Sequence, residues 1–474
     1  MTPEYNQPEE FRRQGHQLID YLADYFENCN SSAIPVTVPL DPEDSFQYWN
    51  SVLNDRGLPL MDLLKEIVSK SIHLHHPGYV GHQVSASHPS SILADLLAAT
   101  LNNGMAVYEM GQVSVAMEKA ICNLLTKKIG WDTKSTGFFT SGGTLANLTA
   151  LLSARQVYSH SKYWNEGHTN KRYAVMVSSE AHYCIDRAVK IMGLGDDGII
   201  HVPINENFKA DISTLEQVYS DASANGLEIF AFVANAGSTA TGSYDNIDAI
   251  ASFCKTKKIW LHVDGAHGGA VLFSNKYDHL INGINHADSM TLDFHKLLQT
   301  PILCTSLLYK TENNSYETFS QGAKYLFQDQ SHEWYQLGKR TFECTKSMMV
   351  LKAFCLLQQL GVEKLSYDID YRYDLARTFA TLIKDDPDFE LATFPESNIV
   401  CFRILFDKID IQSANQYSQE IRKKINASGN FYLVQTQIKD TIYLRCSLMN
   451  VTTNLETLNR LLAEIKTYKQ KYKI

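Results

Sequence analysis

Long apolar runs are missing from this 474-residue sequence. Apolar stretches such as residues 91–101 are short and interrupted, in that case by Asp95, whereas a membrane-spanning helix needs about 20 consecutive apolar residues. A secretory signal has a basic region that is followed by an apolar core. The first ten residues do not show this pattern. We therefore expect a cytoplasmic protein that has no membrane anchor.

Clustered positive charge and paired cysteines are also missing. The chain has 43 Lys and Arg against 52 Asp and Glu, a net charge of −9, and no basic stripe that could follow a phosphate backbone. Its nine cysteines are scattered without a Cys-x-x-Cys pair, so we expect reduced, buried thiols and no metal site. These absences argue against a nucleic-acid partner and against a disulfide-stabilised fold.

Hydrophobic periodicity predicts an α/β protein. From about residue 80, helical patterns alternate with short apolar runs at residues 173–177, 229–234, 259–263 and 289–292. Such alternation is typical of a largely parallel sheet covered by helices.

The segments on either side of this core predict two further parts. Apolar residues at helical spacing over residues 5–28, followed by a proline-containing connector, indicate a helical arm. After a helix predicted for residues 341–360, alternating runs at 399–405 and 441–446 indicate a smaller α+β domain. The predicted division is an arm at 1–79, a large domain at 80–350 and a small C-terminal domain at 351–474.

A polar stretch over residues 311–339 interrupts the large domain. It contains Gly322 and the apolar residues Tyr325, Leu326 and Phe327, and it is too long for a simple connector. We therefore predict a lid at about residues 311–340.

A lysine and an aspartate predict the chemistry. Asp264 and Lys296 each end a strand-like apolar run. A lysine amine can hold pyridoxal 5'-phosphate as a Schiff base, and a carboxylate near the pyridine nitrogen keeps that nitrogen protonated. Either residue alone could be a solvated charge or a helix cap. Together they predict a pyridoxal phosphate site.

Three further segments fit the same site. Residues 140–147 place two glycines before a helix, which suits a phosphate group, although a plain capped helix is the alternative. His182 follows a predicted strand and could stack on the cofactor ring, or could be a surface residue. Small residues at 235–239 would fit beside the ring, or form an ordinary turn. All of these segments follow predicted strands, so we expect them to meet at one edge of the sheet.

Five motifs resemble those of the group II pyridoxal-phosphate-dependent amino acid decarboxylases. They are His-Pro-Gly-Tyr at 76–79, Asp-Gly-Ala-His at 264–267, Asp-Phe-His-Lys at 293–296, Ala-Lys-Tyr-Leu-Phe-Gln at 323–328 and Tyr-Leu-Arg at 443–445. The resemblance covers nearly the whole chain. It implies fold type I, with a mostly parallel seven-stranded sheet, a small α+β C-terminal domain and an N-terminal helical arm. It also implies a homodimer with the active site at the subunit interface.

The resemblance implies a role for each matching position. Lys296 would hold the cofactor, Asp264 would pair with its pyridinium, and Tyr325 of the lid would protonate Cα after carbon dioxide leaves. The residues expected to bind the cofactor are Gly143, Thr144, His182, Thr239, Asp264, Ala266, His295 and Lys296. The residues expected to bind the substrate are His82, Gln83, Ser85 and Arg445.

Two departures from the family bear on the substrate. Many relatives read Asn-Pro-His-Lys where this chain reads Asp-Phe-His-Lys at 293–296, a form that resembles the diaminobutyrate branch. Residues 82–85 also replace the aromatic segment of the enzymes that act on aromatic substrates. We predict decarboxylation of an L-amino acid with an acidic or diamino side chain. The alternatives are aldehyde synthesis, transamination or a lyase reaction on the same fold, or a cofactor-binding protein without catalysis.

Overall fold

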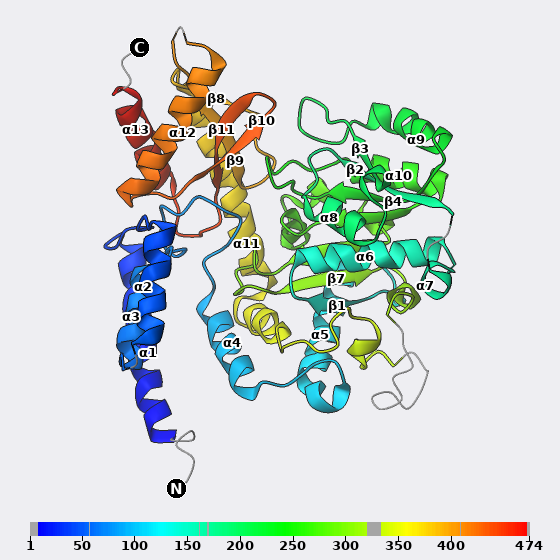
Figure 1. Ribbon diagram of the computed structural model, residues 1–474, viewed down its shortest axis with the longest axis horizontal. Coiled ribbons are helices and arrows are strands. Elements are labelled where there is room, and N and C mark those ends of the chain that lie inside the picture. Colours follow the sequence, from blue (N-terminus) through cyan, green and yellow to red (C-terminus); the bar gives the residue numbers. More distant parts are fainter. Residues whose placement is uncertain are drawn as a thin grey trace. The chain divides into compact units, whose positions relative to one another are not determined.

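The predicted strands form a seven-stranded sheet in the computed structural model, in the order β1-β7-β6-β5-β4-β2-β3 (Figure 1). β7 is antiparallel to both β6 and β1, and the remaining neighbours are parallel. The strands are β1 Thr136–Thr140, β2 Arg172–Ser178, β3 Ile199–Val202, β4 Leu227–Asn235, β5 Trp260–Asp264, β6 Ser289–Asp293 and β7 Thr305–Tyr309. The mostly parallel α/β sheet of fold type I is therefore confirmed.

The structure describes residues 8–55, 57–160, 162–167, 170–319, 333–407 and 409–471. The chain divides into two compact units. The large unit contains Gln83–Arg377 and Thr393–Val400, and the small unit contains Met1–His82, Thr378–Ala392 and Cys401–Ile474. Compactness does not test whether a part folds as a domain, so the predicted domain boundaries stay predictions.

Helices cover the large sheet. α6 packs across β4, β5, β6 and β7, while α5 packs on β1, and α9 and α10 pack on β4. The α-helices of this unit are α4 Pro89–Leu101, α5 Tyr108–Ile129, α6 Gly143–Tyr158, α7 Lys162–Glu166, α8 Cys184–Ile191, α9 Leu215–Ala224, α10 Ile247–Lys257 and most of α11 Val350–Asp385. Its short 3-10 helices are η1 Asp196–Gly198, η2 Ile212–Thr214, η3 Gly268–Phe273, η4 Asp278–Ile281, η5 Ile284–His286, η6 Glu312–Ser315 and η7 Leu337–Lys339.

Strand direction determines where a site can form. β1 and β6 are both antiparallel to β7, so they run in the same direction as one another. The carboxyl ends of β1, β2, β4, β5 and β6 therefore lie at one edge of the sheet. β1, β5 and β6 are buried along their whole length, as expected for strands covered on both faces.

The helix predicted for residues 341–360 is wrong at its start and confirmed at its end. α11 Val350–Asp385 begins nine residues later than predicted, and it is broken directly after residue 360 at Gly361, whose positive φ of 70° is not helical. Tertiary contacts hold the preceding segment out of a helix: the Lys346 amine pairs with Glu118 at 2.6 Å and donates to the Phe139 carbonyl. Both side chains of this ion pair are about 1% exposed, so the segment is anchored in the core.

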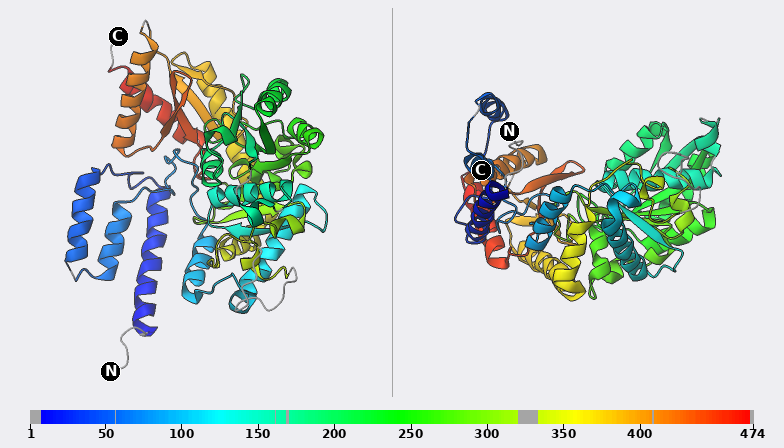
Figure 2. Two further views of the ribbon diagram at one scale, coloured as in Figure 1. Left: turned by 45° about the vertical axis from the view of Figure 1, so that its right-hand side comes forward. Right: turned by 90° about the horizontal axis from the view of Figure 1, so that it is seen from below.

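The small unit contains a four-stranded sheet in the order β10-β11-β9-β8. α12 packs on β11 and on α13, and in the N-terminal segment α1 lies beside α3 (Figure 2). The strands are β8 Phe389–Leu391, β9 Ile399–Ile404, β10 Val434–Ile438 and β11 Thr441–Ser447, and the helices are α1 Pro8–Asn30, α2 Pro42–Asn54, α3 Leu60–Ser69, α12 Ile411–Ser428 and α13 Leu455–Lys469. The strands and helices predicted for the small α+β part, and the predicted N-terminal helix, are confirmed. Within the described ranges, no helix combines the length and apolar character needed to cross a membrane.

Candidate functional site

A cavity of about 370 Å³ lies at the carboxyl edge of the large sheet. Its walls come from the segments that follow β1, β2, β4, β5 and β6. All eight residues predicted to bind the cofactor line it: Gly143, Thr144, His182, Thr239, Asp264, Ala266, His295 and Lys296. The volume is in the usual range for small-molecule sites. The structure thus brings together segments that are up to about 150 residues apart in sequence.

One end of the cavity is built for an anion. The chain turns at Gly142, whose φ of 111° favours glycine, and α6 begins at the next residue. The first amides of a helix have no partner within it, and they carry the positive end of the helix dipole. A Cβ added to Gly143 would lie 3.4 Å from Asp293 Oδ1 and 3.5 Å from Ala266 Cβ, so a side chain there would occupy this space. This end suits a phosphate group.

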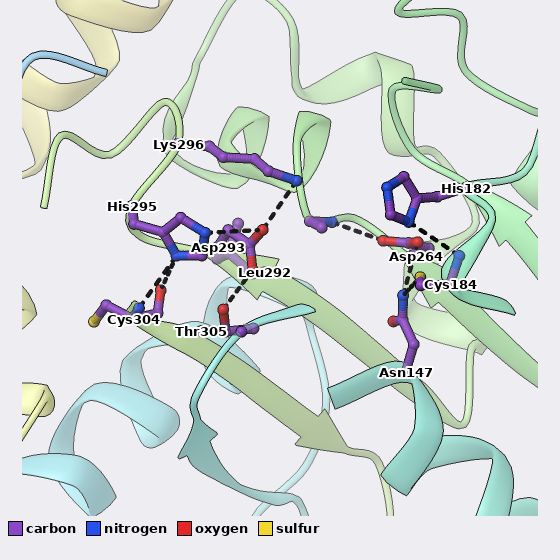
Figure 3. Close-up of polar contacts among 12 residues, drawn as sticks. Asn147, His182, Cys184, Asp264, Leu292, Asp293, His295, Lys296, Cys304 and Thr305 are labelled. Carbon is purple, nitrogen blue, oxygen red and sulfur yellow. Dashed lines mark hydrogen bonds and ion pairs between the residues drawn. The ribbon is translucent and has the colours of Figure 1, made fainter. Parts of the chain in front are cut away.

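The Asp264 carboxylate is held by two hydrogen bonds. Its Oδ2 accepts from Asn147 Nδ2 at 2.8 Å, and its Oδ1 accepts from the Ala266 amide at 3.1 Å. Figure 3 shows Asn147, Cys184 and His182 gathered around Asp264. The carboxylate is therefore fixed in orientation at the cavity wall, where only 8% of the residue is exposed.

A buried relay continues behind Asn147. Its Oδ1 is 3.0 Å from His262 Nε2, the Nδ1 of His262 is 2.8 Å from Ser289 Oγ, and Trp260 Nε1 donates to that oxygen at 2.8 Å. The Asn147 carbonyl is an acceptor, so His262 donates from Nε2 and accepts at Nδ1. Burial lowers the pKa of His262 to about 4, which agrees with this neutral form. Every donor in the relay, which ends at Asp264, thus has an acceptor.

Lys296 lies in the turn after β6, close to a second carboxylate. Its Nζ is 3.0 Å from Asp293 Oδ2, and its backbone carbonyl accepts a hydrogen bond from the Ser85 hydroxyl. Burial acts to lower the pKa of Lys296, but the carboxylates of Asp293 and Asp264 outweigh it and raise that pKa. The amine is ordered at the cavity, and 22% of its side chain is exposed.

His182 lies in the segment between β2 and α8. Its Nδ1 accepts from the Cys184 amide at 3.2 Å, which fixes the ring. Burial lowers the pKa of His182, while the Asp264 carboxylate acts in the opposite direction. The result is a mainly neutral imidazole at neutral pH, and a neutral flat ring suits stacking.

The residues predicted to bind the substrate are less closely grouped. The Ser85 hydroxyl donates a hydrogen bond to the Lys296 backbone carbonyl. Gln83 is buried, and its Nε2 has no hydrogen-bond partner in the described part of the chain. His82 and Arg445 belong to the small unit. Arg445 lies in β11 and is 7% exposed, so it is not the surface arginine that its place near the C-terminus would suggest. Their substrate contacts stay predictions.

Tyr325 and the lid motif at 323–328 lie outside the described residues. The predicted role of Tyr325 as an acid therefore stays a prediction.

Sequence reasoning missed four polar residues of the site: Asn147, His262, Asp293 and Thr305. Two of them carried a signal. His262 precedes Asp264 by two positions in a strand, so both side chains project from the same face. Asn147 lies one helical turn after Gly143 and therefore points in a similar direction.

Comparisons with known proteins agree with this geometry. Residues 42–405 match the family model described as the pyridoxal-dependent decarboxylase conserved domain. The L-2,4-diaminobutyrate decarboxylase of Acinetobacter baumannii is 28% identical, over 86% of this chain and 82% of that protein. The cysteine sulfinic acid decarboxylase of Rattus norvegicus is 31% identical, over 76% of this chain and 74% of the relative. The crystal structure of mouse CSAD has a TM-score of 0.91 and 25% identity, and covers 98% of this chain and 99% of its own.

Proposed function

Because the chain belongs to the pyridoxal-dependent decarboxylase family, we propose that the cavity at the sheet edge is its active site. The chain is a pyridoxal 5'-phosphate-dependent carboxy-lyase that acts on an amino acid. The observation that supports the location is the meeting of Lys296, Asp264 and His182 with the amino end of α6 in one cavity. None of these groups is close to the others in sequence.

The residues of the cavity fit the cofactor in charge and shape. Gly143, Thr144 and the first amides of α6 would hold the phosphate, and Lys296 would hold the aldehyde carbon. Asp264 would face the pyridine nitrogen, and the neutral ring of His182 would stack on the cofactor. When bound, pyridoxal phosphate supplies an electron-accepting ring that stabilises the negative charge left at Cα as carbon dioxide leaves.

The residues of the chain have separate tasks in this reaction. Asp264 holds a proton on the pyridine nitrogen, and Asn147 and the Ala266 amide keep the carboxylate in position for that task. His182 shields one side of the reacting atoms from water. Tyr325 donates the proton to Cα that completes the amine product.

For the substrate we propose an L-amino acid with an acidic or diamino side chain. Relatives named for L-2,4-diaminobutyrate and for cysteine sulfinic acid support this class. Asp-Phe-His-Lys at 293–296 and the polar residues at 82–85 support it from the sequence. The buried Gln83 amide, whose Nε2 has no hydrogen-bond partner among the residues that the structure describes, is available to a polar group.

Product analysis tests the function. Purified protein with pyridoxal phosphate is given acidic, diamino, basic and aromatic L-amino acids, and carbon dioxide, amine, aldehyde and peroxide are quantified. We expect equal amounts of carbon dioxide and amine from one polar class. Aldehyde with peroxide would instead indicate an aldehyde synthase. Absence of carbon dioxide from every substrate, with the cofactor bound, would indicate a transaminase or another lyase.

We further propose a cytoplasmic homodimer. Twofold pairs are the commonest oligomers of soluble chains. α4 supports an interface, because Leu93, Leu96, Leu97 and Leu101 recur at helical spacing and are each about half exposed.

A further inference from the structure

The cavity contains a second buried carboxylate, to which the proposed function gives no task. Asp293 ends β6 and is 2% exposed. Its Oδ2 lies 3.0 Å from Lys296 Nζ and 3.6 Å from His295 Nε2. Its Oδ1 accepts from Thr305 Oγ1 at 2.5 Å. Figure 3 shows the Lys296 amine turned toward this carboxylate.

Asp293 and Asp264 have different partners. Asp264 is bonded to a side-chain amide and a backbone amide, in the relay that runs through Asn147. Asp293 instead contacts an amine and an imidazole on the turn after β6, and a hydroxyl on β7. The first carboxylate is therefore held by neutral donors, and the second is paired with the reactive lysine itself.

The pairing of Asp293 with Lys296 affects the protonation of the lysine amine. An asparagine amide in place of Asp293 could not balance the charge of an ammonium group. An amine that is buried without a counter-ion tends to lose its proton, because burial disfavours the charged form. A carboxylate at 3.0 Å reverses that tendency.

We propose that Asp293 is a positioning residue that keeps the free ε-amino group of Lys296 protonated and in one place. The proposal rests on the proposed role of Lys296 as the lysine that holds the cofactor. It assigns Asp293 a task during amine exchange, the step in which the substrate amine replaces the lysine on the cofactor.

The proton balance of the exchange agrees with this task. With the cofactor bound, a substrate that arrives as an ammonium ion would take the place of Lys296 on the cofactor. The two protons that its nitrogen would release would end on the Lys296 nitrogen, which would leave as an ammonium group. Asp293 stabilises the resulting Lys296 ammonium, which is not a nucleophile and so does not displace the substrate again.

The groups that face this pair come from several elements. Those with an electrostatic effect on Lys296 or Asp293 include Asp264 on β5, His295 after β6, Cys184 on α8, His182 before α8 and Cys304 before β7. Asp264 shares the negative sign of Asp293, whereas burial raises the pKa of the two thiols to about 12 and so keeps them neutral. Burial acts to raise the pKa of Asp293, but Lys296 and His295 outweigh it and lower that pKa.

The test is the protonation of the Lys296 nitrogen in Asp293→Asn. In the holoenzyme, the visible absorbance of the Lys296-bound cofactor changes with pH as that nitrogen loses its proton. A neighbouring carboxylate favours the protonated form, so we expect the midpoint to fall by about 1–3 pH units in D293N. In the cofactor-free full chain, acetic anhydride labels only neutral amines. Labelling of Lys296 at pH 8, measured by mass spectrometry, should rise about tenfold for each pKa unit lost.

Two variants serve as controls. Asp288 precedes β6 at its other end and is a half-buried carboxylate, which accepts from the Leu261 amide. D288N therefore removes a nearby negative charge without touching Lys296 and should leave both midpoints unchanged. T305V keeps the Asp293 charge but removes a hydrogen bond to it, so its shift should be smaller than that of D293N. The exposed Lys190 is the internal reference for labelling.

The results separate this inference from the proposed function. A midpoint in D293N equal to that of the wild type would overturn the role of Asp293, even if the enzyme releases carbon dioxide normally. If D293N does not fold, the wild-type chain still decides. A labelling midpoint of Lys296 at or below that of an ordinary lysine, about 10.4, would contradict the proposal. Failure of the proposed function would appear instead in the product analysis.

Discussion

At the scale of single residues, two carboxylates with different partners line the proposed cofactor site. Asp264 accepts hydrogen bonds from two amide groups, whereas Asp293 pairs with the Lys296 amine. In the sequence, both are simply acidic residues that follow predicted strands. Their partners distinguish them: Asp264 is bonded at the cavity wall, whereas Asp293 faces Lys296 (Figure 3).

Asp264→Ala should lower turnover more than it weakens cofactor binding. The carboxylate is proposed to keep the pyridine nitrogen protonated, and that charge matters most when electrons move into the ring. We expect kcat to fall by about 10²–10³-fold, with the cofactor still bound as seen in its absorbance. Full activity in this variant, with normal cofactor content, would remove Asp264 from the mechanism.

At the scale of elements, α6, β5 and β6 jointly build the support of Asp264. The relay from Trp260 through Ser289, His262 and Asn147 crosses all three elements without leaving the buried interior. A substitution in any one of these elements should therefore alter how firmly the Asp264 carboxylate is held in position.

His262→Phe should destabilise the protein and lower its turnover. It leaves the Asn147 carbonyl and the Ser289 hydroxyl without their partner, which costs about 1–3 kcal/mol of the free energy of unfolding. Asn147 then loses the bond to its carbonyl oxygen and holds Asp264 less firmly, so kcat should fall more than KM changes. His262→Gln keeps a donor and should recover part of both losses. Equal behaviour of the two variants would contradict the relay.

The same histidine adds a pH dependence to stability. Its pKa in the folded protein, about 4, is below that of an unfolded histidine, about 6.5. The unfolded chain therefore binds the extra proton first, and stability falls as the pH decreases from about 6.5 to 4. This part of the loss should be absent in H262Q, as measured by denaturant unfolding at both pH values.

At the scale of the whole molecule, the proposed homodimer is directly testable. Light scattering on the holoenzyme should give twice the mass of one 53.5 kDa chain. Replacing Leu93 and Leu97 on α4 with Glu places charge on the exposed apolar face and should shift the mass toward one chain. Glu at the exposed Ile191 of α8 is a matched control that should leave the mass unchanged. A single-chain mass for the wild type would reject the dimer.

The sequence determined the fold class and pointed to the residues that we propose as cofactor ligands. Parallel strands buried on both faces need continuous apolar runs, and these runs end in the polar residues of the site, so local pattern located the strands before Asp264 and Lys296. The phosphate loop and His182 followed from the same logic, because all such ends meet at one edge.

Only the tertiary structure decided which polar groups pair. Asn147 reaches Asp264 over 117 positions and Ser85 reaches Lys296 over 211, separations at which sequence spacing carries no information. The segment before α11 was predicted as helix but is held open by the buried pair of Lys346 and Glu118. Likewise, Asp293 differs from an ordinary strand-end aspartate only through the amine that folding brings within 3.0 Å. Charge pairing depends on distance and burial, and both arise only when the sheet is complete.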